Sequence, residues 1–133
     1  MAEKLHFSLV SPQRELFAGL VDQVDAEGTE GGFGVLAGHA PFMTALKEGQ
    51  LRVHNDGKVT VFDVRGGFAD VTPEGLTVLA EDAVDLADVD NAKLEQQIKD
   101  AQEDVRDANG DTARNGAQRT LARLEGMRAA IAR

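Results

Sequence analysis

Residues 50–62 read QLRVHNDGKVTVF and indicate how the first part of this 133-residue protein folds. Two segments with strand composition, 50–54 and 58–62, flank the compact turn Asn55-Asp56-Gly57, in which glycine supplies a positive φ. Outward from this hairpin, residues 5–10 alternate between apolar and polar side chains, as a half-buried strand does. Many short strands separated by turns favour an antiparallel sandwich or flattened barrel, with a mixed α+β domain as the alternative.

Neighbouring segments extend this pattern. Ser11-Pro12 ends the first strand, and one stretch with less regular alternation is predicted over residues 17–28. The turn Thr72-Pro73-Glu74-Gly75 leads into another short apolar segment, residues 76–80. We therefore expect a β-unit over residues 1–86.

After the β-unit, Gly, Val, Phe and Pro give way to Ala, Gln, Asp, Glu and Arg, and apolar side chains recur at helical spacing. This pattern predicts an antiparallel helical hairpin over residues 87–133. Asp90 is the predicted N-cap of the first helix, Asn109-Gly110 is its predicted end, and Asp111 is the predicted N-cap of the second. Whether the second helix is regular through Asn115-Gly116 stays open, because glycine disfavours helix. The predicted apolar stripes are Leu94, Ile98, Ala101, Val105 and Ala108, and Ala117, Leu121, Leu124 and Ile131 with Met127 beside them.

Charge and composition exclude several classes of function. The chain has a net charge of −9, no Trp, no Tyr and 6 Phe, which argues against nucleic acid as a partner because phosphate binding needs clustered cations. The absence of cysteine excludes disulfides, thiolate metal sites and a cysteine nucleophile. No apolar run reaches the roughly 18 residues of a membrane-spanning helix. We therefore expect membrane association only through a partner.

The sequence does not predict catalysis or a metal site. The glycine-rich stretch 28–38 lacks the following helix and the Gly-Lys-Ser/Thr of a phosphate-binding loop, so turns explain its glycines better. The histidines His6, His39 and His54 belong to different predicted elements. There is also no Gly-x-Ser-x-Gly elbow. These observations predict a protein that is not an enzyme.

The charges of the predicted hairpin segregate between its helices. The first helix is rich in Asp and Glu, and the second carries a row of arginines. One interpretation is that two solvated faces compensate each other, with little stabilisation from each exposed pair. The other is that the arginines face an acidic partner when the hairpin opens. The arginines are Arg114, Arg119, Arg123, Arg128 and Arg133.

Two blocks of the β-unit carry a family resemblance. Residues 30–49, EGGFGVLAGHAPFMTALKEG, resemble the signature of the epsilon subunit of F-type ATP synthases. Residues 66–71, GGFADV, together with Val78-Leu79-Ala80-Glu81, resemble a second block of that family, and residues 5–19 follow its opening. The resemblance implies a ten-stranded flattened antiparallel β-sandwich followed by a C-terminal two-helix hairpin.

The resemblance also implies a role. Members of this family are non-catalytic subunits of the central stalk, and they couple rotation of an ion-driven c-ring to the catalytic head through the gamma subunit. The implied location is peripheral, on the cytoplasmic face of the bacterial inner membrane. In some relatives the C-terminal helices inhibit hydrolysis, which implies further contacts with the alpha and beta subunits. The implied gamma interface is His39, Ala40, Pro41, Phe42 and Met43. The implied c-ring-facing turn is Glu30, Gly31, Gly32 and Phe33. The implied regulatory helix carries Arg114, Arg119, Arg123 and Arg128.

The sequence departs from the family at the nucleotide motif of the hairpin. In the family this motif has the form [IL]-D-x-x-R-A, whereas residues 89–94 here read VDNAKL. Asp90 is kept, but Lys93 replaces an arginine with a planar, forked donor set, and Leu94 replaces a small residue. We therefore expect no required cofactor and weak or absent ATP binding at Asp90 and Lys93. The alternatives to a coupling subunit are a nucleotide-gated sensor and an unrelated β-sandwich enzyme or lectin.

Overall fold

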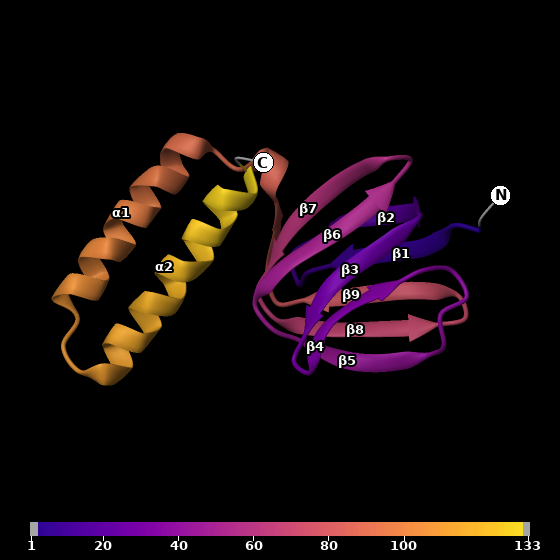
Figure 1. The fold of residues 1–133 in the computed structure, drawn as a ribbon, viewed down its shortest axis with the longest axis horizontal. Coiled ribbons are helices and arrows are strands. Elements are labelled where there is room, and N and C mark those ends of the chain that lie inside the picture. Colours follow the sequence, from indigo (N-terminus) through magenta and orange to yellow (C-terminus); the bar gives the residue numbers. More distant parts are fainter. Residues whose placement is uncertain (1–2, 132–133) are drawn as a thin grey trace. The chain divides into compact units, whose positions relative to one another are not determined.

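The computed structural model describes residues 3–131, which form ten β-strands followed by two α-helices (Figure 1). The protein divides into two compact units, residues 1–85 with the strands and residues 86–133 with the helices. Residues 132 and 133 of the predicted hairpin lie outside the described residues. The strands are β1 (Leu5–Val10), β2 (Glu15–Val21), β3 (Gln23–Gly28), β4 (Gly31–Val35), β5 (Phe42–Leu46), β6 (Gly49–Asn55), β7 (Lys58–Val64), β8 (Gly67–Thr72), β9 (Gly75–Ala80) and β10 (Ala83–Asp85).

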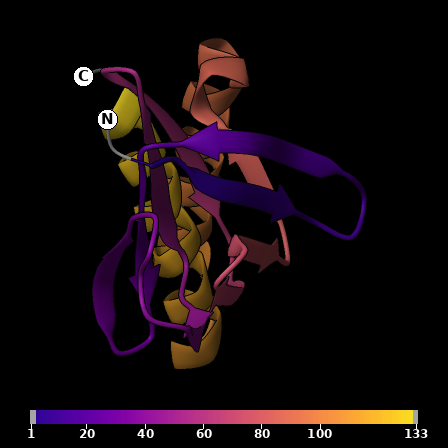
Figure 2. The same ribbon diagram turned by 90° about the vertical axis from the view of Figure 1, so that its right-hand side faces the viewer.

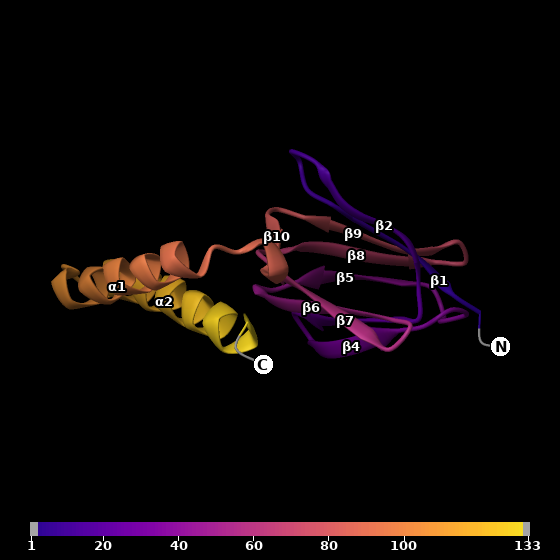
Figure 3. The ribbon, with the colours of Figure 1, turned by 90° about the horizontal axis from the view of Figure 1, so that it is seen from above.

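The strands of the first unit form one curved sheet. Its order is β10-β7-β6-β3-β5-β8-β9-β1-β2, with β4 paired to β3 off this path. The sheet curls so that β6 and β7 lie across the interior from β8 and β9 (Figures 2 and 3). All pairs are antiparallel except β1 with β9, where Phe7 lies beside Leu76 in parallel register. The expected ten-stranded sandwich is confirmed, with one parallel pair in it.

One hydrophobic cluster fills the interior of the first unit. The predicted alternation in β1 is confirmed, since Phe7 and Leu9 are buried and His6 is exposed. Phe17 of β2 contacts aromatic rings of two other strands. Its ring centroid lies 5.5 Å from that of Phe7 on β1 and 6.4 Å from that of Phe62 on β7. All members of the cluster fall between residues 5 and 83. The first unit therefore has a core of its own.

The β6–β7 hairpin is the one that the sequence predicts. Strand pairing ends with Asn55 beside Lys58, which leaves Asp56 and Gly57 as a two-residue turn. Their φ values of 53° and 78° lie in the left-handed region, as a type I′ turn requires at both positions. Glycine meets this requirement without steric cost, which is why the Asp-Gly pair signals the turn in the sequence.

Residues 17–28 are two strands and not one stretch. β2 and β3 separate at Asp22, whose amide donates to the His54 carbonyl of β6 at 2.8 Å. The Asp22 carboxylate accepts from the Asp56 amide at 2.8 Å and lies 2.7 Å from Lys4 Nζ. These three contacts lie where β2, which pairs with β1, gives way to β3, which pairs with β6, although the hydrophobic pattern shows no break there.

The second unit begins with a short 3₁₀ helix, η1 (Leu86–Asp88), and continues as α1 (Asn91–Asp107) and α2 (Asp111–Ile131), which pack together. Asp90 caps α1 as predicted. Its Oδ1 accepts from the Ala92 amide at 2.9 Å and from the Lys93 amide at 3.2 Å. Buried residues from the predicted stripes are Leu94, Ile98 and Ala101 of α1 and Leu124 and Met127 of α2.

The start of α2 differs from the prediction. Asp111 is the first helical residue rather than the N-cap, because the Arg114 amide donates to the Gly110 carbonyl at 3.2 Å. The helix is also regular through Asn115-Gly116. Once a helix has nucleated, adding a residue costs less than interrupting it, and this outweighs the low propensity of one glycine. Within residues 3–131, neither helix combines the length and apolarity needed to cross a membrane.

Candidate functional site

The loop between β4 and β5, residues 36–41, holds the first residues of the implied gamma interface. The His39 amide donates to the Leu36 carbonyl at 3.2 Å and closes a turn. Nδ1 of the His39 ring lies 2.8 Å from the Ala40 carbonyl oxygen, which can only accept, so Nδ1 is the donor. His39, Ala40 and Pro41 are all exposed. These three residues therefore lie together on the surface of the first unit.

Phe42, the next residue of the implied interface, points back toward the core. Its ring centroid lies 5.1 Å from that of His39 and 5.3 Å from that of Phe33, which meets it edge to face at 80°. Phe33 and Phe42 are both half-buried and pack against the hydrophobic cluster. We call Phe33, Phe42 and His39 the aromatic stack. It connects the surface loop to the interior.

Met43 points the opposite way and belongs to an exposed apolar area on β5, β8 and β9, strands that lie side by side (Figure 1). Met43 is 66% exposed, Phe68 55% and Leu79 56%. Phe68 pairs directly with Leu79, and Leu79 pairs with Val10 of β1. An open cavity of about 360 Å³ lies beside them, lined partly by Pro12. We call Met43, Phe68, Leu79, Val10 and Pro12 the outer apolar surface.

Phe68 and Leu79 are not among the predicted interface residues, although the sequence contains a signal for them. In β8 the side chains of Ala69 and Val71 are buried. Because side chains alternate along a strand, those of Phe68 and Asp70 point outward. The same parity places Leu79 outside, because Val78 is buried. Two large apolar residues that pair on the outward faces of neighbouring strands form a contiguous patch, which indicates a contact surface.

The implied c-ring-facing turn is the tip of the β3–β4 hairpin. Gly28 pairs with Gly31, which leaves Thr29 and Glu30 as a two-residue turn with an exposed Glu30 carboxylate. The Thr29 amide donates to the Ala45 carbonyl of β5 at 3.0 Å and ties the tip to the neighbouring strand. Gly31 and Gly32 are exposed as well. Three of the four implied residues are thus at the tip, whereas Phe33 belongs to the aromatic stack.

Charged groups surround the base of this hairpin. Nε2 of His54 lies 2.8 Å from Asp25 Oδ2, and Gln23 Nε2 donates to the other oxygen of Asp25 at 2.6 Å. Lys47 Nζ lies 3.8 Å from a carboxylate oxygen of Glu27. These polar pairs occupy the outer side of β3 and β6, beside an open cavity of about 340 Å³. The area therefore carries charges of both signs.

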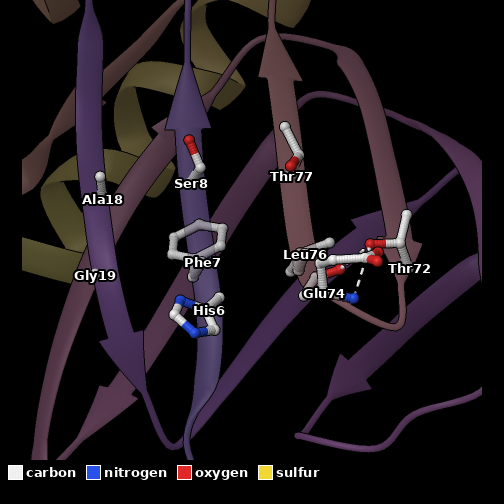
Figure 4. A pocket seen from close by; sticks show the side chains of 10 residues that line it. His6, Phe7, Ser8, Ala18, Gly19, Thr72, Glu74, Leu76 and Thr77 are labelled. Atoms are coloured by element: carbon white, nitrogen blue, oxygen red, sulfur yellow. Dashed lines mark hydrogen bonds between the residues drawn. The ribbon is translucent and has the colours of Figure 1, made fainter.

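A third open cavity, of about 250 Å³, lies over β1 and β9 (Figure 4). His6, Ser8 and Thr77 line it, and Ser8 pairs with Thr77 across the two strands. In the described residues no hydrogen bond joins His6 to either hydroxyl, so no nucleophile–base pair is formed here. His6, His39 and His54 do not come together. Across residues 3–131, no three His, Cys, Asp or Glu side chains are grouped as a metal ion would require.

In the second unit, the arginines do not form one uniform row of pairs. Arg128 of α2 reaches across to Glu95 of α1, with 3.2 Å between Nη1 and Oε2. Arg114 instead lies 3.7 Å from Asp111 within its own helix. Arg123 donates to the Met127 sulfur at 3.7 Å, and Arg119 is exposed. At the nucleotide motif, one oxygen of Asp90 is engaged in capping α1, and Lys93 is exposed.

A β-sandwich followed by a two-helix hairpin defines a class of ATP synthase subunits, and both units match family models from it. Residues 4–86 match the model described as ATP synthase, Delta/Epsilon chain, beta-sandwich domain. Residues 90–131 match the model of the C-terminal domain of the ATP synthase epsilon chain. This protein belongs to the ATP synthase epsilon chain family. Because the protein belongs to this family, the alternative of an unrelated β-sandwich enzyme or lectin is excluded.

Relatives support this assignment over the full length. The ATP synthase epsilon chain of Maricaulis maris is 52% identical over 132 residues, which cover 99% of both sequences. The ATP synthase epsilon chain of Caulobacter vibrioides is 66% identical over 84 residues, which cover 63% of this sequence and 98% of that relative. The Caulobacter relative is therefore too short to contain counterparts of both units.

Solved structures share the fold. A subunit of the Euglena gracilis mitochondrial ATP synthase, solved as OSCP/F1/c-ring in rotational state 1, matches with a TM-score of 0.81 and 25% identity, over 98% of this protein and 83% of that one. A subunit of the Tetrahymena thermophila mitochondrial ATP synthase central stalk/c-ring matches with a TM-score of 0.68 at 15% identity, over 98% of both. The second likeness concerns the fold alone.

Proposed function

We propose that this protein is a non-catalytic rotor subunit of an F-type ATP synthase, which couples rotation of the c-ring to the catalytic head through the gamma subunit. Family membership supports this role, as does the likeness to a subunit in an F1/c-ring assembly. The proposed location is the cytoplasmic face of the bacterial inner membrane, with contact to the membrane only through the complex. The contribution is mechanical, and the protein needs no cofactor for it.

The observation that carries the proposal is the outer apolar surface. Met43, Phe68 and Leu79 each expose more than half of their side chains on neighbouring strands. Phe68 and Leu79 are directly paired, and Met43, whose own partner is Asp70, lies diagonally to Phe68. Exposed apolar residues grouped in this way mark interaction sites on soluble proteins. The exposed loop residue His39 precedes β5, the strand that carries Met43. Gamma therefore binds His39 to Pro41 and the outer apolar surface, and Phe42 supports the contact from inside.

Substitution of Phe68 tests the gamma contact. Phe68→Asp places a charge at the centre of the outer apolar surface and is expected to weaken binding to purified gamma by about tenfold or more, as loss of an interface anchor does. Val59→Asp is the matched control, because Val59 is also half-exposed, at 50%, but lies on β7. Equal binding by the two variants would refute the assignment of this surface.

The β3–β4 tip is the proposed contact with the c-ring. Glu30 is exposed there, and the two glycines that follow it add no side chain that would keep a partner at a distance. A cysteine introduced at Glu30 is expected to form a disulfide with cysteines placed in the polar loops of the c subunit in the assembled complex. A cysteine at Glu74, in the exposed β8–β9 turn, serves as the control position. Cross-linking at Glu74 but not at Glu30 would reverse the assignment.

The second unit is the proposed regulatory element, which opens and uses its arginines against the alpha and beta subunits to inhibit hydrolysis. The match of residues 90–131 to the epsilon C-terminal domain and the exposed Arg119 support this role, whereas Arg128 and Arg114 pair with acidic residues as a compensating face would. Deleting residues from Asp88 onward is expected to leave assembly intact and to raise the ATPase activity of the purified complex. Unchanged ATPase activity would exclude inhibition by the hairpin.

Tight ATP binding is not part of the proposed role. The Asp90 carboxylate already accepts two backbone amides of α1, and a nucleotide would have to compete with this cap. Lys93 offers a single ammonium in place of a forked guanidinium. Calorimetric titration of the isolated protein with Mg-ATP is expected to give no heat at millimolar ligand. Saturable heat at micromolar ligand would establish the alternative of a nucleotide-gated sensor.

A further inference from the structure

The aromatic stack joins two strands that are not hydrogen-bonded to each other. Strand β4 pairs with β3, whereas β5 pairs with β8 and, at one position, with β3. The rings of Phe33, in the middle of β4, and Phe42, at the start of β5, form a side-chain contact between these strands, with centroids 5.3 Å apart. The turn of residues 36–39 lies between these strands in the sequence.

Phe33 supports His39 through Phe42. The Phe42 ring lies between the two, with its centroid 5.3 Å from that of Phe33 and 5.1 Å from that of His39. Phe33 is also half-buried and packed on the core, whereas its neighbours Gly31 and Gly32 are exposed. If the Phe33 ring were removed, Phe42 would lose one of its packing partners and His39 would lose a fixed platform.

We propose that Phe33 is a positioning residue, which holds the His39 loop in the shape that meets gamma although Phe33 itself lies behind that surface. The identity of the partner rests on the proposed function, whereas the positioning rests on the stack. A loop held in its bound shape loses less conformational entropy on association, so a defect at Phe33 weakens binding without removing a contact.

The first test uses proton NMR of the isolated full-length protein and needs no partner. The Hδ2 and Hε1 signals of His39 report the ring current of Phe42. Phe33→Leu is expected to move them in the same direction as Phe42→Leu does. Phe17→Leu is the matched control, because Phe17 is another half-buried ring in contact with two phenylalanines of the core. His39 signals that stay in place in Phe33→Leu, or that move equally in Phe17→Leu, would overturn the proposal.

The second test is a double-mutant cycle on gamma affinity. Phe33→Leu is expected to weaken binding about two- to tenfold, the range that an aromatic pair contributes, and Phe33→Tyr is expected to retain it. In a His39→Ala background, Phe33→Leu is expected to have little further effect, because the loop it positions has lost its contact. Full additivity of the two losses would overturn the positioning role. A wild-type protein that fails to bind gamma would instead refute the proposed function, and the NMR result would still decide the role of the stack.

Discussion

At the scale of single residues, Lys4 is the centre of a dense group of polar contacts in the first unit. Its ammonium lies 2.7 Å from Asp22 Oδ1, 3.0 Å from Asp56 Oδ1 and 2.6 Å from Asn55 Oδ1. The hydrogen bonds to Asp22 and then Asp56 raise the pKa of Lys4 above its ordinary value. The hydrogen bond from Lys4, followed by that from the Asp56 amide, lowers the pKa of Asp22. The group connects the segment before β1 to two turns.

Removing the Lys4 ammonium is expected to lower the melting temperature of the protein at pH 7. Lys4→Met keeps most of the aliphatic stem but leaves two carboxylates close together without their cation. Lys58→Met is the control, because Lys58 is an exposed lysine at the same β6–β7 turn. The measurement is thermal unfolding followed by circular dichroism. A Lys4→Met melting temperature equal to that of Lys58→Met would contradict the expected role of the group.

The pH dependence of this group follows from the direction of the Asp22 shift. Because the folded-state pKa of Asp22 is lowered, its contribution to stability is present above the ordinary value of 3.8 and is lost as the pH falls through the lowered pKa. Asp22→Asn is therefore expected to be less stable than wild type at pH 7, with a difference that shrinks below pH 3.8. Urea unfolding at a series of pH values measures this. A difference that is constant from pH 7 to pH 2 would show that Asp22 does not act through its charge.

At the scale of elements, the two units use glycine in opposite ways. Gly67 begins β8 with a φ of 130°, and a Cβ at this position would clash with the Leu79 carbonyl oxygen of β9. Gly116 lies inside α2, where a Cβ would meet nothing within 4 Å. The first glycine is required by close approach of two strands. Gly116, by contrast, only lowers the stability of α2, because no neighbouring atom requires a glycine there.

Gly67→Ala is expected to destabilise the first unit by more than about 2 kcal/mol, since it combines an unfavourable φ with a backbone clash. Gly19→Ala in β2 is the control, because a Cβ there makes only an ordinary contact of 3.7 Å with Phe17. Urea unfolding of both variants gives the comparison. Equal stability of the two would mean that β8 and β9 adjust without cost.

Gly116→Ala is expected to stabilise α2 by about 0.5–1 kcal/mol, the difference in helix propensity. Hydrogen exchange of the α2 amides measures the change, with greater protection expected in the variant. Gly110→Ala provides the contrast, because Gly110 has a φ of 87° and its replacement is expected to reduce protection. Reduced protection in Gly116→Ala would contradict this prediction, because it would mean that alanine at this position destabilises α2.

The sequence predicts those elements whose causes are local. The Asp56-Gly57 turn and the Asp90 cap each depend on side chains within a few residues, and both are present in the structure. The break at Asp22 depends on Lys4 and on the β6–β7 turn, which are distant in sequence, so local patterns do not predict it. Strand β4 has three glycines among its five residues and therefore no β-propensity to reveal it.

The candidate site follows the same rule. The family resemblance points to the loop at His39 and the tip at Glu30, and both are on the surface. The contact between Phe33 and Phe42 depends on packing between strands, which spacing along the sequence does not specify. Phe68 is easily mistaken for a core residue because it is apolar and lies in a strand, whereas the parity of β8 places it outside.

At the scale of the whole molecule, the hydrophobic core of the first unit is formed by residues of that unit alone. All residues of its hydrophobic cluster lie between positions 5 and 83, before η1 begins. The Caulobacter vibrioides relative, matched over 84 residues and 98% of its length, shows that a protein of this size exists in the family. The helical unit is thus an addition to a sandwich that is complete in itself.

A truncated protein that ends at Ala87 is expected to fold on its own and to unfold in a single cooperative transition. It is also expected to bind gamma with the affinity of the full-length protein, because the outer apolar surface lies wholly within the first unit. Thermal unfolding and a binding titration with purified gamma check these expectations. A truncated protein that folds but no longer binds gamma would place part of the interface on the helices.

The one parallel pair of the sheet has a consequence for biosynthesis. Strand β1 leaves the ribosome first, yet its parallel neighbour β9 follows only after about 70 further residues, since Phe7 pairs with Leu76. At translation rates of about 5–20 residues per second, the open edge of β1 waits roughly 4 to 14 seconds for its partner. The nascent sandwich is therefore unable to close until nearly the whole first unit has been translated, and slow synthesis lengthens the exposure of that edge to other proteins.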